Sequence, residues 1–198
     1  MPAKPERREA ALLYAEMRNF TRMSEVLQPD KVLELANEFF ALASRAIIAG
    51  AGNVVSVHND SILASFVEGE PKGFNDDALK TAQAIQAQFG PLGERWQREY
   101  GLPAAVAAGV HTGEALFGMA GPLGAQQFVA FGDCVSIAER LVHRARAGEI
   151  VISIDVMKAL GAKAQTLGAE ELPPLELGGK RAPLPIYGML LETRLDFT

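Results

Sequence analysis

The sequence predicts an α+β fold, in which helices pack on a mixed β-sheet. Short apolar runs of strand length alternate with longer segments whose apolar residues recur at helical spacing. Their order is strand, helix, strand, strand, helix, strand, strand, helix, strand, which opens with a βαβ unit and continues with a hairpin. Neither a GxGxxG nor a GxxxxGK[ST] phosphate loop occurs, and the alternation of a doubly wound sheet is missing. We expect the helices to cover one face of the sheet.

The composition is that of an ordinary globular protein. The chain has 198 residues, of which 48% are apolar and 22% charged, and this length suggests one domain. We expect the domain to span residues 11–191, after a flexible lead-in over residues 1–10 and before a tail over residues 192–198. The lead-in is charged and lacks the apolar segment of a signal peptide. No stretch approaches the roughly 18 uninterrupted apolar residues of a membrane span.

The charge and the cysteine content limit the binding partners and the cellular compartment that we expect for this protein. Nineteen basic residues against 24 acidic ones give a net charge of −5 at pH 7, which offers no broad surface to a nucleic-acid backbone. A local anion site remains possible. The single cysteine, Cys134, can form neither an internal disulfide nor a cysteine-based metal cluster. A reducing, cytoplasmic location is therefore expected.

Helical spacing predicts three long helices, preceded by a short helical start over residues 19–27. The first begins at Pro29, a residue favoured at the first helical position, and stops at Gly50. The second has Asn75-Asp76-Asp77 as its capped start and is broken or kinked at Gly90-Pro91. The third is capped by Asp133.

Apolar runs bounded by turn residues predict the strands. The expected strands cover residues 11–17, 54–57, 62–66, 104–110, 128–131 and 149–154, with two further candidates around residue 175 and over residues 185–190. His58-Asn59-Asp60-Ser61 supplies the turn of a hairpin between the second and third strands.

Four segments stand out at the ends of these strands: LLYAEMRNFT (12–21), VVSVHNDSILASF (54–66), AAGVHTGEALFG (107–118) and FVAFGDCVSIAERL (128–141). In this order and spacing they resemble the class III nucleotidyl cyclase catalytic domain, the domain of adenylyl and guanylyl cyclases. The closing stretch GGKRAPLPIYGML (178–190) is similar to the last segment of that family. The resemblance covers roughly residues 11–190.

The resemblance implies a ferredoxin-like α+β core and a head-to-tail dimer with two active sites at the interface. In that family two carboxylates bind two divalent cations, Mg²⁺ or Mn²⁺. The ribose 3′-hydroxyl of ATP or GTP then attacks the α-phosphate and expels pyrophosphate. The carboxylates of each site come from one chain, and an Asn–Arg pair comes from the other.

The first carboxylate position of the family, usually an aspartate, holds Glu16. Glutamate can ligate Mg²⁺ or Mn²⁺, but its arm is one methylene longer, and a small displacement at such a site can cost about 100-fold in rate. Asn19 takes the place of the family glycine that approaches the phosphates, where a side chain crowds that approach. Phe20 and Thr21 match the family pattern.

The second carboxylate, Asp60, matches the family directly. Its flanking glycines are replaced by Asn59 and Ser61, and asparagine tolerates the positive φ of a tight turn. The base-selecting lysine is replaced by Ser56 and its partner by Val129, so neither the long cation nor the hydrogen-bonding group that reads a purine is present.

The ribose-positioning asparagine maps to Ser136 and the phosphate-binding arginine to Arg140. Their i, i+4 spacing places both on one helix face. A guanidinium suits a phosphate oxygen, but serine lacks the reach of a carboxamide, and loss of one such donor costs about 100–1000-fold in rate. His58, His111 and Cys134 are interpreted as structural residues, although His58 beside Asp60 is a conceivable third ligand.

The sequence leaves three functions open. The first is a diverged domain with weak or absent cyclase activity and a regulatory or ligand-binding role in signalling. The second is an active two-metal cyclase with unusual purine selection. The third is a subunit that completes a heterodimeric cyclase.

Overall fold

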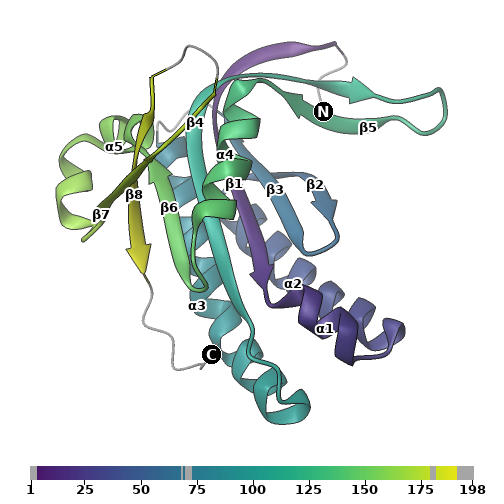
Figure 1. Ribbon diagram of the computed structural model, residues 1–198. Helices are drawn as coiled ribbons and strands as arrows, with labels where there is room; N and C mark the ends of the chain where they lie inside the picture. Colours follow the sequence, from purple (N-terminus) through teal and green to yellow (C-terminus); the bar gives the residue numbers. More distant parts are fainter. Residues whose placement is uncertain (1–3, 68, 70–72, 179–181, 191–198) are drawn as a thin grey trace.

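The computed structural model describes residues 4–67, 69, 73–178 and 182–190 and confirms the predicted α+β fold (Figure 1). Eight strands form one sheet in the order β2-β3-β1-β4-β6-β8-β7, and β5 pairs with the far end of β4. β4 and β6 run parallel, whereas the other strand pairs of the described sheet are antiparallel. The strands are β1 (Glu6–Arg18), β2 (Asn53–His58), β3 (Ser61–Val67), β4 (Ala105–Ala120), β5 (Gln127–Phe131), β6 (Glu149–Ser153), β7 (Glu170–Leu175) and β8 (Leu184–Leu190).

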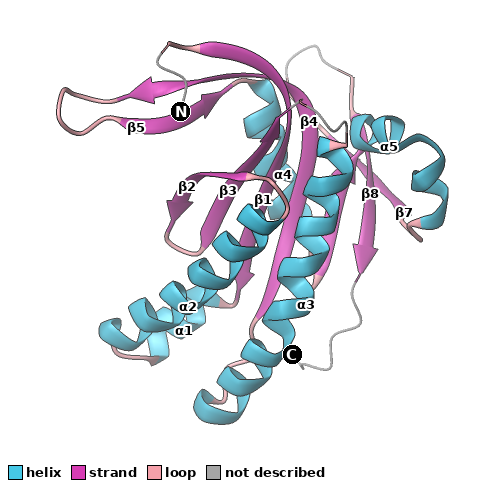
Figure 2. Cartoon of the chain, turned by 180° about the vertical axis from the view of Figure 1, so that it is seen from behind, coloured by secondary structure: helices cyan, strands magenta, loops and turns pink. Residues whose placement is uncertain are grey.

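Helices cover both faces of the sheet, not one face as predicted (Figures 1 and 2). The long α2 (Pro29–Ala49) and α3 (Phe74–Tyr100) pack on one face, and α4 (Asp133–Arg144) packs on the other. The central strand β1 shows why, since Leu13 is buried under α2 and α3 whereas Leu12 is buried in the cluster below α4. A continuous apolar run is typical of a strand covered on both faces.

β1 begins at Glu6, so residues 6–10 are part of the sheet and not of a flexible lead-in. Their backbones pair with β4, from Glu6 opposite Phe117 to Ala10 opposite Gly113. The charged side chains of this stretch are mostly exposed, and Arg7 pairs across the strands with Glu114 at 2.5 Å. β4 is 16 residues long, and its second half pairs with residues 6–10. The polar sequence of residues 6–10 gave no sign of this pairing. Residues 1–3 and 192–198 lie outside the described residues.

α3 continues through Pro91 to Tyr100, although a break was predicted at Gly90-Pro91. A proline inside a helix removes one hydrogen bond and crowds the preceding turn. Beyond it, however, Trp96 is fully buried and packs edge-on against Phe89 with 5.3 Å between ring centroids. The indole N–H of Trp96 also donates to Glu38 of α2 at 2.9 Å. These tertiary contacts outweigh the local cost of the proline.

Two of the predicted helix caps lie inside their helices. α3 is capped by Gly73 and α4 by Gly132, so Asn75 and Asp133 are helical residues, and neither helix has a side-chain cap. The short α1 (Phe20–Val26) agrees with the predicted start. The helices α5 (Ile154–Leu160) and η1 (Gly161–Thr166) were not predicted. Among the described residues, none of the helices combines the length and apolar character needed to cross a membrane.

A buried histidine joins β4 to the start of α5. His111 is 5% exposed, and its Nδ1 lies 2.8 Å from Oγ of Ser153, the N-cap residue of α5. Burial lowers the pKa of His111, and the charge of Asp155 opposes this shift only partly. Neutral His111 is therefore the form that the folded protein accommodates, in agreement with the structural interpretation.

This burial predicts a loss of stability in mild acid. The unfolded chain protonates His111 near its ordinary pKa of about 6.5, whereas the folded chain resists protonation, so the contribution is complete above that pH and is lost below it. Each pH unit between the two pKa values removes up to about 1.4 kcal/mol. Urea unfolding at pH 7 and pH 5 should show this loss, and His111→Gln should reduce it. An identical pH dependence in wild type and variant would contradict this assignment.

Candidate active site

The two predicted metal carboxylates lie at adjoining ends of neighbouring strands. Glu16 sits on β1 opposite Ser61, the first residue of β3, and Asp60 occupies the turn just before it. The backbone N–H of Met17 donates to the carbonyl of Asp60 at 2.9 Å, which fixes the turn against the end of β1. Main-chain contacts thus hold Glu16 and Asp60 close together, although the two residues are more than 40 positions apart.

The turn residues adopt the backbone conformations that the family glycines would provide. Asn59 has a φ of 40° and Asn19 a φ of 73°, both in the left-handed region that asparagine tolerates better than most residues. A hydrogen bond fixes the side chain of Asn19 at the start of α1, since its Nδ2 donates to the carbonyl of Pro103 at 2.8 Å. The β2–β3 hairpin therefore forms with Asn59 in place of glycine, as predicted, and α1 begins at Asn19 without a glycine.

Glu16 is 14% exposed and already has a cationic neighbour, Arg18. The guanidinium of Arg18 donates to its Oε1 and also to the carbonyls of Val142 and Ala145 at the end of α4. Nε2 of His143 lies 3.5 Å from its Oε2. Arg18 thereby ties the end of β1 to the end of α4. Its guanidinium donates to the Ala145 carbonyl and shares the Val142 carbonyl with the backbone N–H of Ala145.

The carboxylate pair suits a hard divalent cation. Magnesium is often held by one or two carboxylates and completes its shell with water and substrate phosphates. No cluster of three or more His, Cys, Asp or Glu side chains able to hold a metal occurs in the described part of the chain, so His58 adds no third ligand to such a cluster. Within the same described residues, no hydrogen bond or ion pair occupies the Asp60 carboxylate. Glu16, in contrast, must leave Arg18 before it can ligate a cation with that oxygen.

Ser136 and Arg140 share one face of α4, as their spacing predicted. Ser136 is exposed and Arg140 is partly buried, on the side of the helix opposite the buried Ala138 and Val142. Arg140 donates to the backbone carbonyl of Glu176, beyond β7, and so contacts its own chain. This face is open to a second molecule, and the guanidinium is available to an anion once the Glu176 contact is released.

The remaining predicted site residues lie on β2, on β5 and at the start of α1. Ser56 is exposed on β2, next to a bulge, and Val129 is half-buried on β5 opposite Gly118. β2 and β5 contact each other around a shared apolar cluster. Phe20 packs against the main core from the start of α1, whereas Thr21 is exposed. Neither Ser56 nor Val129 contributes a long polar group there.

Arg18 and His143 were missed as site residues in the sequence. Arg18 lies two positions from Glu16, so the alternation of a strand could have placed both on one face. Its link to α4 spans 124 residues of sequence and has no local signature. His143 falls at the end of a predicted helix, where a basic residue is ordinary.

Comparisons with known proteins agree with the cyclase resemblance. A family model described as the adenylate and guanylate cyclase catalytic domain matches residues 3–187. The chain is 30% identical over 137 residues to adenylate cyclase 1 of Rhizobium meliloti (strain 1021), an alignment that covers 68% of this chain and 20% of that protein. It is 26% identical over 140 residues to uridylate cyclase of Rhodovulum sp. (strain MB263), with 67% of this chain and 57% of that protein covered.

The chain therefore spans less than two thirds of either relative. Among solved structures, the adenylyl cyclase CyaB from P. aeruginosa superposes with a TM-score of 0.86 at 20% identity, covering 96% of this chain and 98% of that one. The guanylyl cyclase Cya2 gives a TM-score of 0.78 at 25% identity, with 92% of each chain covered.

Proposed function

Since the chain belongs to the family of adenylate and guanylate cyclase catalytic domains, we propose that it is a dimeric signalling domain that keeps the cation-binding carboxylates of a cyclase but turns nucleotide over very slowly. The observation that carries this proposal is the adjacency of Glu16 and Asp60, set against the short or apolar side chains at the other site positions.

The retained half of the site is the cation-binding half. Glu16 and Asp60 would hold a divalent cation, Mg²⁺ or Mn²⁺, which neutralises a triphosphate and polarises a ribose hydroxyl when bound. The main-chain contact between Met17 and Asp60 holds the turn in place without help from the cation. The side chain of Asn19 is turned to Pro103, which keeps it from the position where the family glycine approaches phosphate.

The missing half is the one that reads and orients the nucleotide. Ser56 and Val129 offer a base no long donor and no second polar group, and polar base atoms left without partners cost about 1–3 kcal/mol each. Ser136 is too short to hold the ribose as a carboxamide does. Arg140 is present and can serve a phosphate oxygen. Binding of a triphosphate is thus supported better than its turnover.

A second copy of the chain completes the arrangement. Figure 1 shows β5 and the paired end of β4 as a hairpin that extends beyond the rest of the sheet. It carries exposed apolar residues, among them Leu123 (96% exposed) and Phe131 (58% exposed), which favours burial against a partner. In the proposed homodimer, Ser136 and Arg140 of one copy face the carboxylates of the other. A heterodimer with a competent cyclase domain uses the same surfaces.

A functioning cyclase with a different base preference is the second candidate. It is favoured by the retention of Asp60 and Arg140 and by the 26% identity to a protein named uridylate cyclase. Small side chains at Ser56 and Val129 leave the base unread, so this candidate predicts substantial product from at least one of ATP, GTP, UTP and CTP.

Product formation separates the two candidates. Folded, dimeric protein is incubated with each of the four triphosphates in Mg²⁺ or Mn²⁺, beside Asp60→Asn. The proposal predicts only trace cyclic product, dependent on Mn²⁺ and absent in the variant. Turnover typical of an enzyme, about 1 s⁻¹ or faster, establishes the second candidate. Activity that appears only after co-expression with a competent cyclase domain identifies the heterodimer subunit.

Arg18 competes with the cation for Glu16, so its removal should strengthen cation binding. Replacing Arg18 by methionine keeps much of its length but deletes the positive charge beside the carboxylate. We expect the affinity for Mn²⁺ to rise about tenfold, together with a small loss of stability because the carbonyls of Val142 and Ala145 lose their bonds to the guanidinium. Electron paramagnetic resonance of free Mn²⁺ measures this directly. Arg22→Met, at an exposed position on α1, is the matched control and should change neither quantity. Equal or weaker Mn²⁺ binding in Arg18→Met would contradict the competition.

A further inference from the structure

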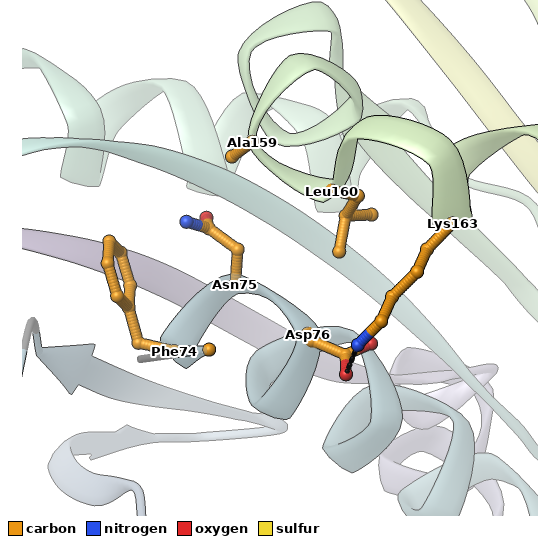
Figure 3. A pocket seen from close by; sticks show the side chains of 7 residues that line it. Phe74, Asn75, Asp76, Ala159, Leu160 and Lys163 are labelled. Carbon is orange, nitrogen blue, oxygen red and sulfur yellow. Dashed lines mark hydrogen bonds and ion pairs between the residues drawn. The ribbon is translucent and has the colours of Figure 1, made fainter. Parts of the chain in front are cut away.

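A cavity lies on the opposite face of the sheet from Glu16 and Asp60. It has a volume of about 340 Å³ and forms where the beginning of α3 meets α5 and η1 (Figure 3). Its walls are Phe74, Asn75 and Asp76 from α3, and Ala159, Leu160 and Lys163 from the other two helices. α3 packs against the face of β1 that faces away from α4, so this cavity is separate from the candidate active site.

Asn75 is the unusual residue of this cavity. Only 9% of its surface is exposed, and its Oδ1 has no hydrogen-bond partner among the described residues. Figure 3 shows its amide directed into the space between Phe74 and Ala159. A buried amide oxygen without a donor is unfavourable, because it has lost water and gained nothing in return. The arrangement therefore indicates a ligand that carries an O–H or N–H group.

The charges around the cavity indicate that the ligand is also an anion. The first bond within α3 runs from the N–H of Asp77 to the carbonyl of Gly73, so the three preceding N–H groups have no acceptor inside the helix. Gly73, the N-cap, has no side chain to serve them. Among the described residues, the start of this 27-residue helix thus presents N–H groups without an acceptor, together with the positive end of the helix dipole.

Two lysines share one carboxylate beside these donors. Nζ of Lys163 lies 2.6 Å from Oδ2 of Asp76, and Nζ of Lys80 lies 2.9 Å from the same atom. The hydrogen bonds from Lys163 and then Lys80 hold the pKa of Asp76 below its ordinary value, so the carboxylate is ionised. Asp77 in the same turn offsets the charge of Lys80, so the N–H groups at the start of α3 and the ammonium of Lys163, not a net side-chain charge, are what favour an anion.

We propose that this cavity binds a small organic acid that carries a hydroxyl or amino group. The N–H groups at the start of α3 and the ammonium of Lys163 receive the carboxylate. Oδ1 of Asn75 accepts the hydrogen of the hydroxyl or amino group. The carbon body lies against Phe74 and Leu160. This proposal does not depend on the cyclase activity, since it uses none of the same residues.

A matched pair of acids tests the donor to Asn75. 3-Phenyllactate and 3-phenylpropionate differ only by a hydroxyl group, and both are titrated into the wild-type chain by calorimetry. We expect saturable binding of 3-phenyllactate. 3-Phenylpropionate should bind about fivefold more weakly, because it lacks the hydroxyl group that donates one hydrogen bond to Asn75. In nuclear magnetic resonance spectra, the side-chain amide signals of Asn75 should shift with the hydroxy acid.

Three variants locate the binding. Asn75→Leu keeps the branched shape of the side chain without its polar atoms and should abolish the preference for the hydroxy acid. Lys163→Gln should weaken both acids equally. Lys158→Gln, at an exposed lysine of the neighbouring α5 outside the cavity, should weaken neither. The proposal is overturned if neither acid nor lactate nor serine binds. It is equally overturned if both acids bind alike and the Asn75 signals of the wild type do not move, an observation that does not require the leucine variant to fold.

Discussion

Replacing Ser136 by asparagine and Glu16 by aspartate in the same chain raises cyclic nucleotide formation at least about 100-fold over wild type. A carboxamide at position 136 restores the donor that holds the ribose, and one such preorganised donor is worth about 100–1000-fold in rate. The shorter carboxylate at position 16 returns the cation to the distance that the family uses, where small displacements matter. Product from ATP and GTP in Mn²⁺ is the measurement.

The controls for this gain use the same two positions. Glu16→Asp combined with Ser136→Ala restores the carboxylate geometry without the donor, and its activity should stay at least about 100-fold below that of the double variant with asparagine. Addition of Asp60→Asn to the active double variant should abolish the product, because one of the two carboxylates is lost. A double variant that is folded and dimeric but no more active than wild type would contradict the assignment of Ser136.

Replacing Gly109 by alanine destabilises the protein by about 3 kcal/mol, because α4 lies directly on the backbone of β4. A Cβ at Gly109 would stand 2.4 Å from the backbone nitrogen of Val142 and 2.6 Å from the carbonyl oxygen of Ala138. Both are main-chain atoms of α4, so the helix itself must move away from the sheet. That movement also displaces Ser136 and Arg140.

Gly118→Ala is the matched control for this substitution. Gly118 lies on the same strand β4, but a Cβ there meets no atom nearer than 3.6 Å, which is ordinary van der Waals contact, and alanine stabilises a strand relative to glycine by about 0.5–1 kcal/mol. Urea unfolding should therefore show a large loss for Gly109→Ala and no loss for Gly118→Ala. A stability of Gly109→Ala within about 0.5 kcal/mol of wild type would contradict the close packing of α4 on β4.

Local patterns predicted most elements of the fold. Periodicity and turn residues, which are local properties of the chain, predict the βαβ unit, the β2–β3 hairpin and the order of the strands along the sequence. The adjacency of Glu16 and Asp60 was implied by the family resemblance and agrees with the strand register. The small residues of β4 likewise have an explanation in the close approach of α4 at Gly109.

The errors share one cause, which is contact between distant parts of the chain. Residues 6–10 join the sheet because β4 extends far enough to pair with them, and α3 survives Pro91 because Trp96 is buried against α2. Arg18 reaches α4 across more than 120 residues. Asn75 resembled a helix cap in the sequence, whereas in the fold it lines a cavity made with α5, an element that no local pattern predicted.

The most direct test of the cation site is the anomalous scattering of manganese in crystals grown with Mn²⁺ and a slowly reacting ATP analogue. The proposed cation site predicts a manganese peak between the carboxylates of Glu16 and Asp60, with the Arg18 guanidinium moved off Glu16. A structure with the triphosphate bound, no manganese at these two residues and Arg18 still paired with Glu16 would contradict it.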